Sequence, residues 1–332
     1  MDKHAAKLLD AAKIRYGAEI REQNRLGNSA NVIYEISLRG KPAILRLSRH
    51  SAHKELHVGF ELAWMNELAR HVPGIAGPLP SSDGKPYEVA DADGEPWILS
   101  VFRKAPGRIV DPGNPAEWHD GLFSSLGELM GDLHRHTRPY VGNIGIDERF
   151  DWRRSFPFWP ENNAWVDPDV QPAWQRTLAA MEALPATPEN YGIVHTDIHH
   201  LNFHVEDGDI VLFDFDDCEY NWYAYDIAST LFFLAGTADY RDAEGGKRML
   251  EKCTVPFLRG YRKRARLSAD WFDLFPLFLR YRRLAQYRYF SNLFHGRENP
   301  HAEYLAWAKE DILEGGGYLA VDFNALRRAI EI

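Results

Sequence analysis

The sequence predicts an α+β protein of two lobes, an N-terminal lobe with an antiparallel sheet and a C-terminal lobe that is mostly helical. Short runs rich in β-branched and aromatic residues, separated by turn-forming residues, are concentrated in the first third of the chain. After them, apolar residues recur mainly at helical intervals. A stretch rich in proline and glycine, residues 104–115, separates the two patterns. We therefore expect one domain over residues 1–102 and a second over residues 103–332.

Composition narrows the classes of protein to consider. With 332 residues, 45% of them hydrophobic, the chain can bury a large core. The net charge of −9 argues against nucleic acid as the main partner, because phosphate binding requires a basic surface, and it favours a cationic or zwitterionic small substrate. We see no signal peptide and no apolar run of the roughly 20 residues that span a bilayer. Cys218 and Cys253 are too far apart to indicate a metal pair or a disulfide framework. We expect a cytoplasmic protein without a membrane partner.

The N-terminal lobe begins with a predicted amphipathic helix over residues 3–15 and a turn-rich stretch over residues 25–31. Strand composition over residues 32–38 and 43–48, with Arg-Gly-Lys-Pro between the two runs, predicts a hairpin.

A second helix and two further strands complete this lobe. Apolar spacing predicts the helix over residues 54–71, where Pro73 and Gly74 end it. An Asp-Ala-Asp-Gly-Glu turn separates strand-like runs over residues 86–90 and 96–102.

The C-terminal lobe is predicted to consist mainly of helices. Pro276 is expected to interrupt the helix that begins at Trp271. The glycines at 315–317 are expected to form a turn, because no strand precedes them and no Lys-Ser/Thr follows. An aromatic insert broken by proline spans residues 150–165. The predicted helices cover residues 118–137, 173–184, 226–234, 248–264, 271–294, 303–313 and 324–330.

The stretch from His195 to Asp226 carries the strongest chemical signal. It reads His-Thr-Asp-Ile-His-His-Leu-Asn, then a polar turn, then Ile-Val-Leu-Phe-Asp-Phe-Asp-Asp. Asp197, Asn202 and Asp214 thereby flank short apolar runs that read as strands. In phosphoryl transfer one carboxylate orients the attacking hydroxyl, while a second carboxylate and an amide oxygen hold Mg²⁺ on the phosphate oxygens. The sequence therefore predicts a phosphotransferase.

This pattern resembles the protein-kinase pair His-Arg-Asp-x-x-x-x-Asn and Asp-Phe-Gly. It is similar residue by residue to the His-x-Asp-x-x-x-x-Asn and Asp-Phe-Asp motifs of the aminoglycoside phosphotransferase family, which includes choline kinases and type II homoserine kinases. Residues 126–134 resemble that family's helix before the catalytic loop. The resemblance implies a two-lobed protein-kinase-like fold with ATP and Mg²⁺ as cofactors. By it, Asp197 is the catalytic base, Asn202 and Asp214 are metal ligands, and Asp226 braces the loop by hydrogen bonding.

The same resemblance implies nucleotide-binding residues in the N-terminal lobe. Residues 27–31 occupy the position of the nucleotide-binding loop, and the strand over residues 99–102 would contact adenine. Arg46 stands where protein kinases carry the lysine of Val-Ala-Ile-Lys, so it would contact the α- and β-phosphates and pair with Glu61. Arginine keeps the charge of lysine but changes its reach and geometry. The residues expected to contact the nucleotide are Gly27, Asn28, Ser29, Arg46, Glu61, Ser100 and Phe102.

Candidates for recognition of the acceptor substrate follow the metal motif. Asp216, Asp217 and Glu219 form an acidic cluster that would suit a substrate amine. Asp216 could instead join a second metal ion, and all three could be hydrogen-bonded structure. His199, in the catalytic loop, could face substrate or solvent. Aromatic residues on either side of the cluster could stack on a cation, although packing in the core is the commoner role.

The predicted activity is phosphorylation of a hydroxyl on a small molecule such as an amino alcohol or an aminoglycoside-like compound. One alternative is a bacterial kinase-like protein Ser/Thr kinase. The lack of an Ala-Pro-Glu motif after Asp214 counts against ordinary protein kinases but not against these bacterial relatives. Another alternative is a metal-dependent hydrolase, because histidines crowd the loop. Their spacing does not match His-x-His-x-Asp-His or His-Glu-x-x-His, and these histidines are His195, His199, His200 and His204.

Overall fold

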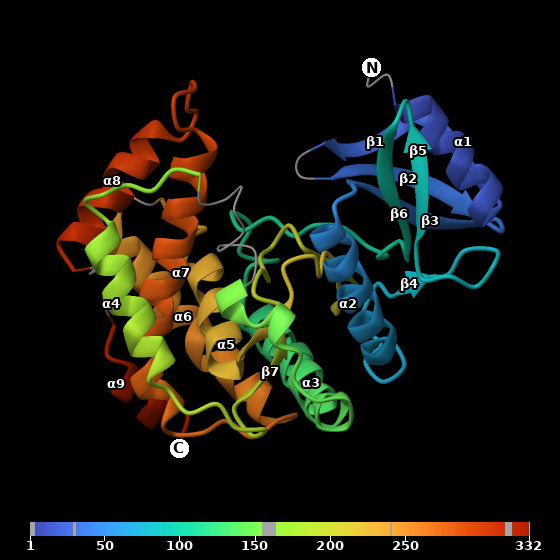
Figure 1. Ribbon diagram of the computed structural model, residues 1–332. Coiled ribbons are helices and arrows are strands. Elements are labelled where there is room, and N and C mark those ends of the chain that lie inside the picture. Colours follow the sequence, from blue (N-terminus) through green and yellow to red (C-terminus); the bar gives the residue numbers. More distant parts are fainter. Residues whose placement is uncertain (1–3, 29–30, 155–163, 240, 316–320, 332) are drawn as a thin grey trace. The chain divides into compact units, whose positions relative to one another are not determined.

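The computed structural model describes residues 4–28, 31–154, 164–239, 241–315 and 321–331 (Figure 1). The chain divides into two compact units, which we call the first unit and the second unit. The first unit comprises Met1–Arg108, His204–Asp207 and Val211–Asp216. The second unit comprises Ile109–Phe203, Gly208–Ile210 and Asp217–Ile332.

An antiparallel sheet forms the body of the first unit (Figure 1). Its strands lie in the order β1-β2-β3-β6-β4, and β5 pairs with β6. Side chains of β2 alternate between buried and half-buried, as expected of a strand with one face on the core. Helix α1 (Ala5–Tyr16) shares that core through Leu8 and Leu9, and the Tyr16 hydroxyl donates to the carbonyl oxygen of Leu99 at 2.8 Å. The strands are β1 (Ala18–Asn28), β2 (Val32–Leu38), β3 (Lys41–Arg49), β4 (Pro78–Leu79), β5 (Glu88–Ala92) and β6 (Glu95–Arg103).

Strand β1 is the main departure from the predicted N-terminal lobe. It extends to Asn28, so Gly27 and Asn28 lie in a strand and not in the turn expected over residues 25–31, and Gly27 pairs with Ile33. An edge strand needs only one hydrogen-bonded neighbour and can be largely polar. The Arg-Glu-Gln-Asn sequence of β1 and its register shifts therefore fit its place at the edge.

Helix α2 (Ala52–Leu68) follows β3 and begins slightly before the predicted residue 54. The Ser51 side chain caps it by accepting a hydrogen bond from the backbone N–H of Lys54 at 3.0 Å. The helix buries Glu61 completely. A buried carboxylate is costly unless it is paired, so this residue must have a partner within the first unit.

Among the described residues, the α-helices of the second unit follow the predicted order more closely than the predicted ends. Helix α7 continues through Pro276, where an interruption was predicted. Packing of its buried face, which includes Phe275, Phe278 and Leu279, outweighs the backbone hydrogen bond that the proline removes. Helix α3 likewise accommodates Pro139 and runs beyond residue 137. Of the aromatic insert, residues 155–163 lie outside the described residues. The helices are α3 (Asp120–Ile144), α4 (Gln171–Glu182), α5 (Tyr223–Ala235), α6 (Ala243–Arg262), α7 (Trp271–Leu293), α8 (Ala302–Leu313) and α9 (Phe323–Ala329).

Helices α3 and α6 approach each other closely through glycines. A Cβ atom on Gly127 of α3 would lie 1.9 Å from the carbonyl oxygen of Phe257, and one on Gly260 of α6 would lie 2.0 Å from that of Ser124. Any larger side chain at either position would force the backbones apart. The Leu-Gly run in α3 therefore fixes the spacing of this helix pair.

Short strands frame the stretch from His195 to Asp226. Strand β7 (Tyr191–Val194) enters it and pairs antiparallel with β10 (Glu219–Trp222), which leads into α5. Strands β8 (Phe203–Glu206) and β9 (Asp209–Leu212) form a hairpin between them. Among the described residues, no helix is long and apolar enough to cross a membrane.

Candidate active site

The loop that follows β7 is held by Asp226 at the start of α5. The Asp226 carboxylate accepts hydrogen bonds from the backbone N–H groups of Thr196 at 2.7 Å and His195 at 3.2 Å. It also contacts Nε2 of His134 at 3.0 Å, while Nδ1 of His134 lies 2.9 Å from the Tyr261 hydroxyl. Burial lowers the pKa of His134, so the ring is neutral, with Nε2–H donating to Asp226 and Nδ1 accepting from Tyr261. The predicted bracing role of Asp226 is confirmed.

Thr196 shows how firmly this loop is fixed. Its φ of 68° lies in the left-handed region, which is unfavourable for a β-branched residue. Every polar group of the residue is used: the N–H donates to Asp226, Oγ1 donates to the carbonyl oxygen of Asp217 at 3.1 Å, and the carbonyl accepts from the Ser229 hydroxyl. Strained residues of this kind persist when the surrounding structure over-determines them, and they cluster at functional sites.

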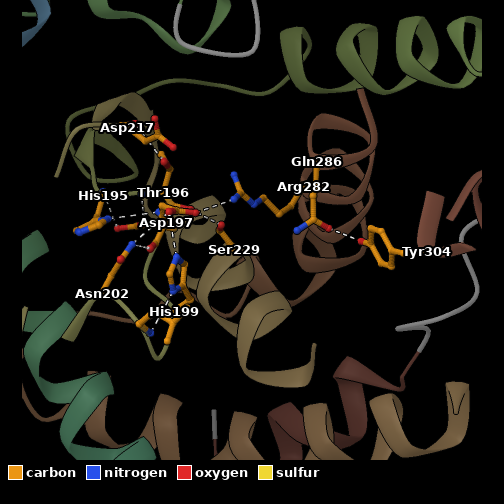
Figure 2. A network of polar contacts seen from close by, with 12 residues as sticks. His195, Thr196, Asp197, His199, Asn202, Asp217, Ser229, Arg282, Gln286 and Tyr304 are labelled. Carbon is orange, nitrogen blue, oxygen red and sulfur yellow. Dashed lines mark hydrogen bonds and ion pairs between the residues drawn. The ribbon is translucent and has the colours of Figure 1, made fainter. Parts of the chain in front are cut away.

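The strained turn presents Asp197, whose two carboxylate oxygens have separate partners (Figure 2). Oδ1 accepts from Nη2 of Arg282 at 2.8 Å. Oδ2 lies 3.3 Å from Nε2 of His199 and accepts from Nδ2 of Asn202 at 3.2 Å. Burial opposes the charge, but His199 and Arg282 outweigh it and hold the pKa of Asp197 well below its usual range. Asp197 is therefore a carboxylate at neutral pH, and its side chain remains 23% exposed.

Asn202 is oriented by the same loop. Its Nδ2 group donates both to the Asp197 carboxylate and to the Asp197 carbonyl oxygen, the latter at 2.9 Å. With Nδ2 turned towards the loop, Oδ1 is the atom that can serve as a ligand. The five-residue interval between the two predicted site residues thus brings them into direct contact, as the motif required.

Arg282 is a site residue that the motif did not reveal. It lies on α7, its side chain is 15% exposed, and its guanidinium stacks 4.4 Å from the ring centroid of Phe233. A sequence signal did exist, because Arg282 falls within the helical spacing of the buried apolar residues Phe278, Leu279 and Ala285. An arginine in such a stripe indicates a buried charge that needs an anionic partner.

A cavity of about 410 Å³ opens beside the loop within the second unit. His199 belongs both to its wall and to the ion pair with Asp197, and its ring meets that of Phe233 edge-on at 5.2 Å. The cavity is lined by His199, His200, Leu201, Phe232, Phe233, Gly236, Thr237, Ala238, Asp239, Arg283, Gln286 and Tyr304.

The first unit contains the predicted phosphate-binding arginine. Arg46 of β3 makes a bidentate ion pair with Glu61 of α2, at 2.8 Å from Nη1 to Oε1 and 2.5 Å from Nη2 to Oε2. Both side chains are buried, and the guanidinium lies 4.9 Å from the ring centroid of Phe102. Burial opposes the charge on Arg46, but the Glu61 carboxylate outweighs it and raises the pKa of the guanidinium. The predicted pairing is confirmed, and Ser100 lies opposite Arg46 on β6.

A second polar group in the first unit surrounds Asp216. Its carboxylate accepts from Nδ2 of Asn31 at 2.9 Å and lies 3.6 Å from Nζ of Lys54. The Asn31 Oδ1 atom in turn accepts from the Ser48 hydroxyl at 2.7 Å. Burial opposes ionisation of Asp216, but Lys54 and Arg46 outweigh it and lower the pKa. Sequence reasoning gave no role to Lys54, which lies beside Asp216, or to Ser48, which is linked to Asp216 through Asn31, because these contacts join residues that are distant in sequence.

The remaining predicted residues are distributed over both units. Asp214 follows β9 in the first unit with a φ of 64°, and its carboxylate contributes to the raised pKa of Arg46. The Asp217 carbonyl oxygen holds Thr196, and Glu219 is buried in β10, where its Oε1 accepts from Asn221 at 2.6 Å. None of Asp216, Asp217 and Glu219 lines the cavity in the part of the chain that the structure describes. Ser29 and the side chain of Asn28 lie outside that part.

The histidines of the loop do not form a common metal site. His195 is buried, and its Nδ1 accepts from the backbone N–H of Asp197 at 3.3 Å. His200 meets the ring of Trp118, and His204 contacts the carbonyl oxygen of Ala105 at 3.1 Å. No three His, Cys, Asp or Glu side chains gather as metal ligands among the residues whose placement is described.

Comparison with known proteins gives a consistent result. A family model described as "Phosphotransferase enzyme family" matches residues 22–267. The chain is 31% identical over 333 aligned residues to the amicoumacin kinase of Bacillus subtilis (strain 168), covering 97% of this chain and 96% of the relative. A solved amicoumacin kinase in complex with AMP-PNP, Ca²⁺ and Ami has a TM-score of 0.83 and 27% identity, with coverage of 97% and 96%. A microcompartment-associated aminopropanol kinase has a TM-score of 0.66 and 22% identity, with coverage of 94% and 99%, and supports the fold alone.

Proposed function

Because this chain belongs to the phosphotransferase enzyme family, we propose that it transfers the γ-phosphate of ATP to a hydroxyl group of a small molecule. The observation that carries this proposal is the pairing of Asp197 with Arg282 next to a cavity that begins at His199. Family membership agrees with the resemblance of the sequence motifs. It also favours a phosphotransferase over the alternative of a metal-dependent hydrolase.

Asp197 is the group that acts on the acceptor hydroxyl. It is ionised at neutral pH, so it accepts a hydrogen bond from the hydroxyl and aims the oxygen at the phosphorus. Its pKa is too low for early removal of the proton, so the proton reaches Asp197 as the new P–O bond forms. Arg282 and His199 fix the carboxylate from opposite oxygens during this step.

The nucleotide would be held by the first unit. Arg46, fixed by Glu61, supplies a permanent positive charge for the α- and β-phosphates. Lys54 supplies a second one nearby, since both cations lower the pKa of Asp216. The strand that carries Ser100 and Phe102 would contact adenine, and residues 27–29 would cover the phosphates.

Mg²⁺ would be bound by Asn202 and Asp214. Amide and carboxylate oxygens are the ligands that this ion prefers, and the orientation of Asn202 leaves Oδ1 for the role. Bound there, the metal would neutralise charge on the phosphate oxygens. The solved relative in complex with AMP-PNP and Ca²⁺ supports the use of a nucleotide and a divalent cation.

The acceptor is a compound such as amicoumacin, since the relatives named for that activity cover nearly the whole chain. The test is incubation of the protein with ATP, Mg²⁺ and amicoumacin, followed by mass spectrometry for one added phosphoryl group. We expect phosphorylation by the wild type and a loss of kcat of at least about 100-fold in Asp197→Asn. Asp207→Asn, at an exposed turn of the β8–β9 hairpin, is the matched control and should keep full activity. Full activity of Asp197→Asn would refute the mechanism.

A further inference from the structure

The far wall of the cavity holds an arginine whose position is fixed on several sides. The Arg283 guanidinium stacks on Trp307 at 4.6 Å and on Phe232 at 5.1 Å from the ring centroids, and it lies 3.7 Å from Oδ2 of Asp311. Its Nη1 group donates to the Tyr304 hydroxyl at 3.0 Å. Arg283 is buried and also lines the cavity, so its guanidinium places a fixed positive charge in this wall.

The donor and the acceptor are defined in the hydrogen bonds that link Arg283, Tyr304 and Gln286. A guanidinium can donate but cannot accept, so the Tyr304 oxygen must be the acceptor of the first bond. The single hydroxyl hydrogen of Tyr304 therefore points away from Arg283 and is donated to Oε1 of Gln286 (Figure 2). This fixes the amide of Gln286 with its oxygen towards Tyr304. The Nε2 group of Gln286, with two N–H donors, is then left for the cavity that this residue lines.

The charged groups of the cavity wall are compensated. His199 is paired with Asp197, and Asp239 is paired with Arg241 at 2.9 Å. The His200 ring packs edge-on against the rings of Trp118 and His199, with 6.2 Å between centroids in each case. Among the described lining residues there is thus no carboxylate without a cationic partner that could receive an ammonium group.

We propose that this cavity binds an uncharged, oxygen-bearing part of the acceptor substrate, such as an amide carbonyl or a neutral hydroxyl, through the Nε2 group of Gln286. The rings of Phe232 and Phe233 contact the adjoining apolar part. An ammonium group is disfavoured there, because it would meet the N–H donors of Gln286 and the charge of Arg283. This inference rests on the proposed function in one respect, namely that the acceptor's hydroxyl reaches Asp197 from this cavity.

The test uses matched pairs of ligands, namely amino alcohols of two to four carbons and their N-acetyl derivatives. Binding is measured first without nucleotide, by ligand-observed NMR, and turnover is measured afterwards with ATP and Mg²⁺. We expect the wild type to bind each N-acetyl compound about tenfold more tightly than its parent amine, the effect of one good hydrogen bond together with an unfavourable charge. The reverse order, equal binding, or binding of neither form would overturn the proposal.

Two substitutions at Gln286 separate its chemistry from its shape. Gln286→Glu keeps the bond from Tyr304 but replaces the N–H donors by a carboxylate oxygen, so the preference should switch to the ammonium compounds. Gln286→Leu should lose the preference for the N-acetyl compounds without gaining any for the amines. The KM for ATP and the melting temperature should match those of the wild type in both variants, which shows that they fold. An unchanged order of preference in Gln286→Glu would overturn the proposal.

The two arms distinguish failure of this inference from failure of the proposed function. N-acetyl compounds that bind the wild type but are not phosphorylated, with no transfer to amicoumacin, would refute the kinase reaction and leave the cavity chemistry standing. Phosphorylation of amicoumacin with a KM that is the same in wild type, Gln286→Glu and Gln286→Leu would support the kinase reaction and refute the assignment of Gln286.

Discussion

Replacement of Arg282 by methionine tests whether this residue positions the catalytic carboxylate. Methionine keeps an unbranched apolar stem beside Phe233, but it is shorter than arginine and removes both the guanidinium stacked on that ring and the charge-assisted hydrogen bond to Asp197. Such a bond contributes about 1.5–3 kcal/mol. Since one pKa unit corresponds to about 1.4 kcal/mol, the pKa of Asp197 should rise by about 1–2 units in the variant.

The size of this pKa shift shows whether Arg282→Met acts through the charge of Asp197 or through the orientation of its carboxylate. The folded-state pKa of Asp197 lies below its ordinary value of 3.8, so a rise of this size still leaves the group ionised at pH 7. A loss of kcat at pH 7 therefore measures misplacement of the carboxylate, for which we expect about 10–100-fold. Between about pH 4 and pH 8, kcat/KM should be independent of Asp197 ionisation in the wild type, and the acid limb below this range should move upward by the same amount of about 1–2 units in Arg282→Met.

The pH dependence of stability provides an independent test of the ion pair between Asp197 and Arg282. Because the folded-state pKa is depressed, the contribution of the pair is complete above 3.8 and is lost as the pH falls through that value towards the folded-state pKa. The difference in melting temperature between wild type and Arg282→Met should hence be constant from about pH 6 to pH 8. Arg280→Met, at an exposed position of the same helix, is the control. A variant with wild-type kcat at pH 7 and an unshifted acid limb would refute the positioning role.

Two further substitutions test the framework of each unit. Glu61→Gln leaves Arg46 buried without its counter-charge, so the free energy of unfolding should fall by about 3 kcal/mol or more in urea titrations. The KM for ATP should rise in the same variant. Unchanged values of both quantities would show that the ion pair is dispensable. Gly127→Ala should destabilise the protein by more than about 2 kcal/mol, because its Cβ would meet a backbone oxygen at 1.9 Å. The control is Gly142→Ala on the same helix, whose Cβ would have no atom within 4 Å and which should be neutral or stabilising. Similar melting temperatures for the two variants would contradict the close approach of α3 and α6.

The parts of the site that are close in sequence could be predicted, and those that are distant could not. Asp197 and Asn202 lie within one loop, so their spacing alone determines that they meet. Asp226 is farther along, but strand β10 pairs with β7 and returns the chain to the start of the loop. Arg282 comes from α7, and nothing local to the motif indicates which face of that helix is turned towards Asp197.

The positions of charged residues in the sequence predicted the site less well than the spacing of its motifs did. The acidic residues after the metal motif looked like a site for a substrate amine, yet Asp216 faces Lys54 and Glu219 is buried beside Asn221. Whether a carboxylate is available to a ligand depends on partners brought in by the fold. Strand β1 was missed for a related reason, because an edge strand with a polar sequence lacks the alternation by which strands are recognised.

Two separate parts of helix α5 contribute to the site, one to the catalytic loop and one to the cavity. Asp226 in its first turn holds the loop that carries Asp197, while Phe232 and Phe233, about two turns later, line the cavity. Substitutions that remodel the cavity from the end of α5, from α7 or from α8 can therefore accumulate without loosening the bracing contact. A gene for such a protein could acquire a new acceptor in small steps while the phosphate-transfer machinery is inherited intact.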